Sequence, residues 1–553
     1  MRITGAQLIV RLLEQQGISI VAGIPGGAAL PLYDAFSQSA IRHVLARHEQ
    51  GAGFIAQGIA RVTGKAAVCM ASSGPGATNL LTAVADAKLD SVPMVCITGQ
   101  VPLGMIGTDA FQEVDTYGIG IPVTKHNYLV RDVRELLRVI PEAFRIAESG
   151  RPGPVWIDIP KDVQTASIDI DELPAPGGTD ATPTIDMADI ERAAQMINAS
   201  QRPVMYIGGG VIQSGASEAA VMLAEQAALP TTSTLMALGA MPSDHPLALG
   251  MLGMHAARFT NFVLEEADLL IVLGARFDDR AIGKAEKFCP NANVIHIDID
   301  AAELGKIRRP HVAVHGDVGQ ALQMLMPHVT ITLRKEWLSR VASLKAAHPL
   351  AMPDADDPRS HYGLVCAVAS LLDDEAIIAT DVGQHQMWVA QAYPFARPRQ
   401  WLTSGGLGTM GFGLPAAIGA ALAEPSRTVV CFSGDGSLQM NIQELATAVE
   451  EGANVKIVLM NNQSLGLVHQ QQDLFYGKRV FAADYRRPMD FVRIAEGFGL
   501  GAYDLDAAED PRGLLSTALR SSGPCLIHAS IDVAQKVFPM VPPGAANTEM
   551  IGG

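Results

Sequence analysis

Two oxygen-bearing side chains, Asp435 and Asn462, each follow a short apolar run in this sequence. The runs, residues 429–432 and 455–460, are rich in β-branched residues and bounded by turn residues, so we expect two buried strands. Residues 437–451 carry apolar side chains at helical spacing, which predicts a strand–helix–strand unit. Ligands bind at the carboxyl ends of neighbouring parallel strands, so Asp435 and Asn462 should face one crevice.

A carboxylate and an amide oxygen in one crevice suit Mg²⁺, which keeps few protein ligands and takes the rest from phosphate and water. Gly434 and Gly436 flank the aspartate and would let a diphosphate approach the backbone. The helix that starts near Ser437 would direct its N-terminal amides at the same negative charge. The sequence therefore predicts a metal-held diphosphate.

A second candidate group, Glu49, comes just before a predicted helix with small residues on a buried face, from residue 51 onward. One interpretation is a solvated acid at a helix start, where the helix dipole favours negative charge. The other is a desolvated acid with a raised pKa, suited to proton transfer. Glycine-rich turns at residues 23–27 and 72–79 lie on either side and could hold a ligand or serve only as turns.

In the middle of the chain, three predicted strands each end in polar residues. These are LGARFDDR at residues 273–280, HIDID at 296–300 and HGDV at 315–318. Aspartates at strand ends often bind ribose hydroxyls, so an adenine-containing ligand is one interpretation and surface turns are the other. GGGVIQSG from residue 208 lacks the third glycine of a dinucleotide fingerprint. GLGTMG at 406–411 has all three, but it lacks a good preceding strand, so we interpret it as a loop before a helix.

Bulk properties exclude several classes of protein. The chain has 553 residues, 48% hydrophobic and 18% charged, which indicates a folded protein of several domains. A net charge of −16 and the lack of Lys/Arg runs argue against a nucleic-acid partner. No signal peptide or membrane-length apolar run is present. The six cysteines are scattered without a CxxC pair, which favours reduced thiols and a cytoplasmic location.

The strand and helix patterns divide the chain into three α/β blocks, each expected to be doubly wound around a parallel sheet. We expect an N-terminal domain at residues 1–165 and a linker rich in Pro, Gly, Asp and Thr at 166–185. A central domain should span residues 186–346 and a polar linker 347–360. A C-terminal domain should span 361–553 and end in an irregular tail.

GDG, 24 further residues and NN resemble the thiamine diphosphate signature. The stretches RHEQGAGFIAQGIAR, SSGPGATN, TDAFQE, RPGPVWIDIPKDVQ, GARFDDR, TDVGQHQMW, SGGLGTMGFGLPAAIGA and PMVPPGAANTEM extend the likeness along nearly the whole chain. Together they resemble the catalytic (large) subunits of acetohydroxyacid synthases, also called acetolactate synthases. TDAFQE and GARFDDR separate the chain from generic thiamine diphosphate decarboxylases.

The resemblance implies roles for named residues. Asp435, Asn462 and the Ser464 carbonyl would hold Mg²⁺, while Glu49 would exchange a proton with the aminopyrimidine ring of thiamine diphosphate. Met410 would force the cofactor into its bent form. The other implied cofactor contacts are Gly26, Pro75, Asn79, Gln384, His385, Gly408, Gly434, Gly436 and Ser437. Because the family binds the cofactor between the first domain of one subunit and the third of another, the resemblance implies a homodimer or a dimer of dimers.

The central domain is expected to bind FAD, without a redox role in the net reaction. The implied contacts are Arg151, Gly208, Gly209, Gly210, Met254, His255, Arg276, Asp298 and Asp317. The implied reaction decarboxylates pyruvate and ligates the hydroxyethyl unit to a second 2-keto acid, pyruvate or 2-ketobutyrate, in branched-chain amino acid biosynthesis. Arg276 would pair with the acceptor carboxylate. Phe111, Gln112 and Lys161 would line the entrance, and a small regulatory subunit is the expected partner.

Two departures from the family pattern matter. NNQSLGLV replaces NNEEQGMV, which is tolerable because the third metal ligand is a backbone atom. Gln471 replaces a tryptophan that favours 2-ketobutyrate, and lost apolar contact costs about 1–3 kcal/mol per methylene. We therefore expect only weak preference for 2-ketobutyrate.

The alternatives are a flavin-free catabolic acetolactate synthase or simple decarboxylase, a nicotinamide oxidoreductase using GLGTMG, and a non-catalytic flavin-binding homologue.

Overall fold

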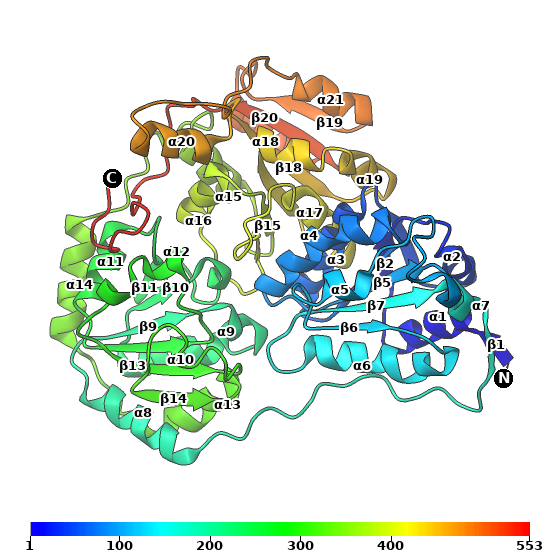
Figure 1. Ribbon diagram of the computed structural model, residues 1–553. Helices are drawn as coiled ribbons and strands as arrows, with labels where there is room; N and C mark the ends of the chain where they lie inside the picture. Colours follow the sequence, from blue (N-terminus) through cyan, green and yellow to red (C-terminus); the bar gives the residue numbers. More distant parts are fainter. Residues whose placement is uncertain (1, 553) are drawn as a thin grey trace.

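Three runs of alternating strands and helices form three six-stranded sheets in the computed structural model, which describes residues 2–552. Within each six-stranded sheet every described pairing is parallel. Parallel strands need crossover connections, here mostly helical, so the predicted α/β fold with three doubly wound domains is confirmed. In Figure 1 the N-terminal domain (blue and cyan), central domain (green) and C-terminal domain (yellow to red) form the three lobes of a triangle.

The N-terminal domain has the strand order β3-β2-β4-β5-β7-β6. A two-stranded antiparallel ribbon, β1 with β8, joins the start of the chain to residues beyond 165. Its strands are β1 (Arg2–Thr4), β2 (Ile20–Gly23), β3 (Arg42–Leu45), β4 (Ala67–Ala71), β5 (Met94–Gln100), β6 (His126–Leu129), β7 (Pro154–Pro160) and β8 (Ser167–Asp169). Its helices are α1 (Gly5–Gln15), α2 (Leu30–Phe36), α3 (Glu49–Thr63), α4 (Pro75–Leu89), α5 (Thr116–Gly120), α6 (Leu136–Glu148) and α7 (Lys161–Thr165).

The central domain has the strand order β11-β10-β9-β12-β13-β14. Its strands are β9 (Pro203–Ile207), β10 (Thr231–Ser233), β11 (Ala248–Met251), β12 (Leu269–Leu273), β13 (Asn293–Asp298) and β14 (Val312–His315). Its helices are α8 (Met187–Ala199), α9 (Gly209–Gln213), α10 (Ser217–Ala227), α11 (Arg258–Glu265), α12 (Asp279–Ile282), α13 (Val318–Leu325) and α14 (Lys335–Ala347).

The C-terminal domain has the strand order β16-β15-β17-β18-β20-β19. Its strands are β15 (Ile377–Thr380), β16 (Trp401–Leu402), β17 (Val429–Gly434), β18 (Val455–Asn461), β19 (Gly501–Asp504) and β20 (Cys525–Ser530). Its helices are α15 (His361–Leu371), α16 (Gln384–Ala392), α17 (Gly413–Ala423), α18 (Asp435–Met440), α19 (Glu444–Glu450), α20 (Gly466–Phe475), α21 (Phe491–Phe498) and α22 (Pro511–Arg520).

Each sheet has a point where the strand order reverses, between β2 and β4, between β9 and β12, and between β15 and β17. Open parallel sheets bind ligands in the crevice outside such a point. Turns follow the strands at each of these points: the two predicted glycine-rich turns at residues 23–27 and 72–79 in the first sheet, residues 208–210 and 274–276 in the second, and residues 381–385 and 434–436 in the third. The fold therefore provides three candidate ligand crevices.

Two local expectations need correction. The helix expected over residues 437–451 is two helices, because α18 begins at Asp435 and ends at Met440, and α19 starts at Glu444. The connecting turn is fixed by Asn441, whose amide donates to the Gly411 carbonyl (2.7 Å) and to Gln50 Oε1 (3.2 Å). The C-terminal tail is irregular as expected, but it packs on the central domain (Figure 1), where Arg258 donates to the Gly552 carbonyl at 2.6 Å.

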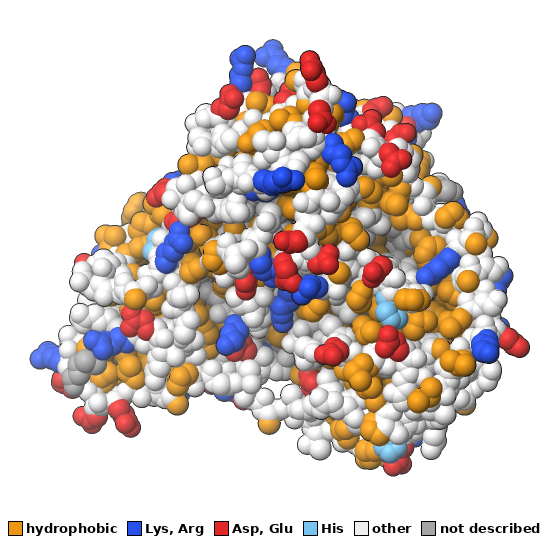
Figure 2. Space-filling model, turned by 180° about the vertical axis from the view of Figure 1, so that it is seen from behind, with side chains coloured by type: hydrophobic (Ala, Val, Ile, Leu, Met, Phe, Trp, Pro, Cys, Tyr) orange, Lys and Arg blue, Asp and Glu red, His pale blue; other side chains and the backbone are white. Residues whose placement is uncertain are grey.

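The N- and C-terminal domains meet through a very close crossing of α3 and α17. A Cβ added to Gly58 would lie 2.0 Å from the Ala416 carbonyl oxygen, and one added to Gly419 would lie 2.0 Å from that of Ile55. Only glycine permits this approach, which fixes the start of α3 against the C-terminal domain. No helix among residues 2–552 is long and apolar enough to cross a membrane. On the face in Figure 2, acidic and basic side chains are interspersed without a broad basic area.

Candidate active site

The predicted metal ligands come together at the carboxyl ends of β17 and β18. Asp435 is 2% exposed, receives a hydrogen bond from the backbone amide of Asn462, and its Oδ1 has no hydrogen-bond partner. Burial raises the pKa of Asp435 to about 6, and the surrounding amides partly oppose this shift. A buried carboxylate oxygen without a partner is costly unless a cation binds it. This oxygen therefore fits the predicted Mg²⁺.

The orientation of the Asn462 side chain also fits a metal ligand. Its Nδ2 donates to Gln384 Oε1 at 3.0 Å, and its Oδ1 accepts the Ser464 amide hydrogen at 3.1 Å. Between these two residues Gln463 has φ +55°, a left-handed conformation that tightens the turn. Gln384 is held in turn by Gln470 Oε1 at 3.0 Å, a buried contact that the sequence did not reveal.

The turn formed by Asn462, Gln463 and Ser464 beside Asp435 is called the metal turn below. The predicted diphosphate residues lie around it. His385 is buried with an unpartnered Nε2, and burial lowers its pKa to about 3, so it is a neutral donor or acceptor. A Cβ at Gly436 would lie 2.8 Å from Leu465 Cδ2 and 2.9 Å from the Tyr485 hydroxyl, so a larger residue would have to displace the ends of these two side chains. Ser437 donates its hydroxyl to the Val382 carbonyl at 2.7 Å, so it already has an acceptor.

Met410 and Gly408 lie on a loop that precedes α17, as the sequence indicated for residues 406–413. The loop is fastened to α4 of the N-terminal domain by two acids, Asp86 and Asp90. Asp86 accepts the Ser404 hydroxyl and the Thr409 hydroxyl (2.8 Å). Asp90 accepts the backbone amides of residues 405 (3.0 Å) and 406 (2.7 Å) and pairs with Arg61 at 2.8 Å. The sequence did not predict these contacts, because Asp86 and Asp90 are far from the loop along the chain.

Glu49 is the first residue of α3 and is partly buried. Its Oε2 accepts a hydrogen bond from Asn79 Nδ2 at 2.9 Å, and Asn79 lies on α4, which begins at Pro75. A Cβ at Gly26 would lie 2.5 Å from that of Ser72, so both glycine-rich turns of the first sheet meet beside Glu49. The structure thus brings together Glu49, Gly26, Pro75 and Asn79. Among residues 2–552, no hydrogen bond joins Glu49 to the metal turn.

The expected entrance residues are on exposed segments. Phe111 is 87% exposed, and Gln112 has φ +59° with its backbone packed on Gly74, where a Cβ would lie 2.7 Å from the Gln112 carbonyl oxygen. Lys161 opens α7 directly after β7. Gln471 is exposed on α20, whereas its neighbour Gln470 is the buried member of the pair. The structure therefore brings Gln112 close to the Glu49 turns and leaves Phe111 free at the surface.

A cavity of about 450 Å³ opens where the three domains meet, at the β9/β12 switch point. It is lined by seven of the nine residues expected to contact FAD: Arg151, Gly208, Gly209, Gly210, Arg276, Asp298 and Asp317. A Cβ at Gly208 would lie 2.3 Å from the Gly274 carbonyl oxygen, so the turns after β9 and β12 pack too closely for a side chain at this position. Asp298 is buried, which raises its pKa to about 6. The cavity also has contributions from Arg61, Arg399 and Trp401, which were not predicted.

The other two expected FAD residues lie elsewhere. Met254 and His255 do not line this cavity, and His255 faces a second cavity of about 390 Å³ between the central and C-terminal domains. Both residues contact the C-terminal tail: the Val541 amide donates to the Met254 carbonyl, and His255 Nδ1 lies 3.2 Å from the Pro539 carbonyl oxygen. Burial lowers the pKa of His255 to about 4.

Comparisons with known proteins agree with this arrangement. Residues 3–119 match the N-terminal TPP binding domain of thiamine pyrophosphate (thiamine diphosphate) enzymes, 190–325 their central domain and 381–529 their C-terminal TPP binding domain. The acetolactate synthase isozyme 1 large subunit of Escherichia coli (strain K12) is 66% identical over 552 residues, covering 100% of this chain and 98% of the relative.

The isozyme 2 large subunit of the same organism is 47% identical over 548 residues, covering 99% of both chains. A probable acetolactate synthase large subunit of Methanocaldococcus jannaschii is 44% identical over 562 residues, covering 99% of this chain and 95% of the relative. The matched domains coincide with the three sheets that carry the metal turn, the Glu49 turns and the large cavity. The chain therefore belongs to the thiamine diphosphate enzymes and, among them, to the acetolactate synthase large subunits.

Proposed function

We propose that this protein is an acetolactate synthase that removes CO₂ from pyruvate and joins the remaining two-carbon unit to the keto carbon of a second 2-keto acid. With pyruvate as acceptor the product is 2-acetolactate, and with 2-ketobutyrate it is 2-aceto-2-hydroxybutyrate. Both belong to branched-chain amino acid biosynthesis. The observation that carries the proposal is the metal turn, in which Asp435 Oδ1 is buried without a partner beside Asn462 and Ser464.

Thiamine diphosphate, when bound, supplies the carbon nucleophile and electron sink of the reaction. Asp435, Asn462 and the Ser464 carbonyl would hold Mg²⁺ against the diphosphate, and the neutral His385 would offer it a ring nitrogen. Glu49 would hold and move a proton at the cofactor's N1′, and Asn79 orients its carboxyl group. Met410 would contact the cofactor from a loop that Asp86 and Asp90 hold.

The large cavity is proposed to hold FAD. The side-chain-free backbone at Gly208–Gly210 suits a pyrophosphate, and the buried Asp298 suits ribose hydroxyls. Arg276 lines this cavity and is partly buried, so its guanidinium is available to a bound ligand. A planar guanidinium pairs with a carboxylate through two parallel hydrogen bonds, so Arg276 is assigned to the acceptor's carboxylate.

A homodimer, or a dimer of dimers, is proposed as the active form. The Glu49 turns and the metal turn make no direct hydrogen bond within one chain, and each lies near exposed apolar side chains. These include Phe111 (87% exposed) in the N-terminal domain and Met440 (53%), Tyr476 (60%) and Phe481 (81%) in the C-terminal domain. A second copy would cover such surfaces, which single-chain proteins rarely expose in numbers.

Two further assignments follow from the relatives' names and from the cysteines. The relatives are called large subunits, which supports a small regulatory subunit as partner. The six cysteines are unpaired, including Cys69 and Cys96, whose sulfurs lie 3.4 Å apart, which supports a reducing, cytoplasmic environment.

The decisive experiment incubates the purified protein with pyruvate, thiamine diphosphate, Mg²⁺ and FAD and measures acetolactate against acetaldehyde. Acetolactate as the main product is expected. Acetaldehyde as the main product would make the protein a decarboxylase. A protein that forms acetolactate at full rate without flavin would be the flavin-free type instead.

A further inference from the structure

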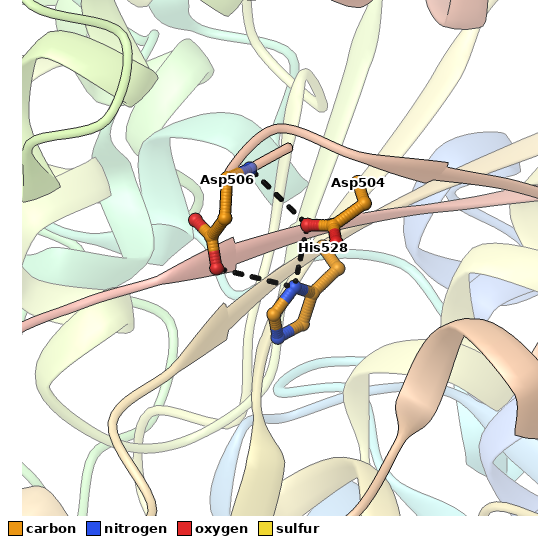
Figure 3. A group of neighbouring side chains, drawn as sticks. All are labelled: Asp504, Asp506 and His528. Carbon is orange, nitrogen blue, oxygen red and sulfur yellow. Dashed lines mark hydrogen bonds and ion pairs between the residues drawn. The ribbon is translucent and has the colours of Figure 1, made fainter. Parts of the chain in front are cut away.

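Three side chains behind the metal turn form a cluster that the roles above do not use. His528 lies on β20, in register with Leu459 of β18 and with Asp504 of β19. Its Nδ1 contacts Asp504 Oδ1 at 3.2 Å and Asp506 Oδ2 at 3.7 Å, and the Asp506 amide donates to Asp504 Oδ1 at 3.1 Å (Figure 3). The His528 side chain is 13% exposed, so its ring is largely enclosed.

The opposite ring nitrogen points to the metal turn. His528 Nε2 lies 3.0 Å from Asn461 Nδ2, and Asn461 immediately precedes the metal ligand Asn462. Exchanging Oδ1 and Nδ2 of Asn461 would break a second hydrogen bond, because Oδ1 accepts the backbone N–H of Gln463 at 3.2 Å. Asn461 Nδ2 is therefore the donor and His528 Nε2 the acceptor.

This direction fixes the tautomer of the ring. A histidine that accepts at Nε2 is neutral and carries its hydrogen on Nδ1, where it donates to Asp504. A ring nitrogen that carries hydrogen does not bind a metal, so the cluster acts as a hydrogen-bonded support even though its three ligand atoms lie within 4.8 Å of one another. The result is a continuous chain of hydrogen bonds between Asp504 and Gln463 through His528 and Asn461, in which each donor lies on the Gln463 side.

The chain ends where the backbone is strained. Gln463 has φ +55°, which costs free energy for a residue with a side chain, and its amide is held by Asn461. Asn462 and Ser464 flank it and present the proposed metal ligands. We propose that His528 is a positioning residue for this turn: by holding Asn461 it keeps the two metal ligands in place before Mg²⁺ arrives. The inference rests on the proposed function of the turn.

Two matched substitutions separate the two ends of the ring. In His528→Asn the shorter amide reaches the position of Nδ1 and can still donate to Asp504, but it cannot reach Asn461. In His528→Gln the longer amide reaches the position of Nε2 and can accept from Asn461. We expect His528→Asn to raise the half-saturating Mg²⁺ concentration on the order of tenfold, as for one lost hydrogen bond. In His528→Gln the half-saturating Mg²⁺ concentration should stay within about threefold of the wild-type value. The kcat at saturating Mg²⁺ should change little in either variant.

Mn²⁺ binding, followed by electron paramagnetic resonance with thiamine diphosphate present, provides a measurement independent of turnover. Thermal unfolding of the metal-free variants tests for a purely structural role. Weaker Mn²⁺ binding in His528→Asn alone, with an unchanged metal-free Tm, supports the inference. Unchanged Mn²⁺ binding in His528→Asn overturns it, as does equal weakening in both variants with a lowered metal-free Tm. A second Mn²⁺ per chain that His528→Asn abolishes also overturns it, because the cluster is then a cation site.

The wild-type measurement keeps this test separate from that of the proposed function. Wild-type protein that binds no Mn²⁺ with thiamine diphosphate would overturn the proposed metal turn and the inference together. Wild-type binding with no effect of His528→Asn would overturn the inference alone.

Discussion

At the scale of single residues, the site separates two tasks between two side chains with different surroundings. Asp435 is buried with an unpartnered oxygen, the condition for holding a cation. Glu49 is only partly buried and is oriented by one hydrogen bond from Asn79. Anchoring the cofactor and moving its proton are therefore expected to be separable by substitution.

Asp435→Ala should abolish retention of thiamine diphosphate through gel filtration in Mg²⁺ buffer, because the metal loses its buried carboxylate. Glu49→Gln keeps the hydrogen bond from Asn79 but cannot exchange a proton, so it should retain cofactor and lose about 10²–10⁴-fold in kcat. Bound cofactor and acetolactate formation are measured on the same preparations. Equal loss of cofactor in both variants would refute this division.

Acceptor choice is a second property of one residue. Gln471 lies exposed on α20, where a neighbouring copy or a bound acceptor could reach it. Gln471→Trp should raise the preference for 2-ketobutyrate over pyruvate by about tenfold or more, since one methylene in an apolar pocket contributes about 1–3 kcal/mol. Competition assays with both acceptors give the product ratio. A strong acetohydroxybutyrate preference in the wild type would contradict the prediction.

At the scale of elements, the loop before α17 depends on α4 of another domain. Thr409→Val removes the hydroxyl that donates to the buried Asp86 (2.8 Å) one residue from Met410. We expect kcat to fall about tenfold with cofactor still bound, because a buried acceptor loses a donor and the loop loosens. Thr63→Val is the control, since that exposed hydroxyl donates only within α3, to the Ile59 carbonyl at 2.8 Å. Equal kcat in both variants would show that the Thr409–Asp86 hydrogen bond does not contribute to catalysis.

The strands of the N-terminal sheet carry a carboxyl group that predicts a pH effect on stability. Burial raises the pKa of Asp158 on β7 to about 7, against hydrogen bonds from Thr98 (2.7 Å) and Gln100 (2.9 Å). Between its ordinary pKa and about 7 the folded state binds a proton that the unfolded state has lost. The free energy of unfolding therefore falls as pH rises through this window and levels off above it.

Asp158→Asn should remove that dependence. The Tm of the variant minus the Tm of the wild type should be larger at pH 8 than at pH 5. The increase should be about 2–4 °C for each kcal/mol by which the wild-type free energy of unfolding falls between these pH values. Differential scanning calorimetry at the two pH values measures it. A Tm difference that is the same at both pH values would show that Asp158 does not titrate in this window.

At the scale of the whole molecule, one cavity joins all three domains. Arg151 enters it from the N-terminal domain and pairs with Glu303 at 2.8 Å and Asp300 at 3.2 Å in the central domain. Arg399 and Trp401 enter it from the C-terminal domain. A bound flavin would thus link the domains mechanically, which is a role without redox chemistry.

Arg151→Ala should therefore lower the flavin content of the purified protein and lower the Tm measured with excess FAD by several degrees, because ligand stabilisation follows occupancy. Arg138→Ala is a matched control: its ion pair with Glu142 lies on the surface of α6, and neither residue lines the cavity. The flavin spectrum and a thermal scan with and without FAD give both quantities. Full flavin content in Arg151→Ala would exclude this arginine from the site.

The sequence alone determined the three parallel α/β domains and most of the candidate site residues. Local signals suffice for these, because alternating apolar runs define strands and helices, and turns with glycine or polar residues directly follow the strands at each switch point. The pairing of Asp435 with Asn462 was predictable because neighbouring parallel strands end at one edge. The resemblance pointed to Glu49 and to the nine expected flavin contacts, seven of which line the cavity.

Only the tertiary structure decided which distant groups touch. It placed Met254 and His255 in contact with the C-terminal tail rather than in the lining of the large cavity. It showed the break after Met440, which long-range hydrogen bonds of Asn441 hold. It also joined His528 to the metal turn through Asn461. Such contacts connect segments that share no local pattern, so their partners are set by packing and by the direction of each hydrogen bond.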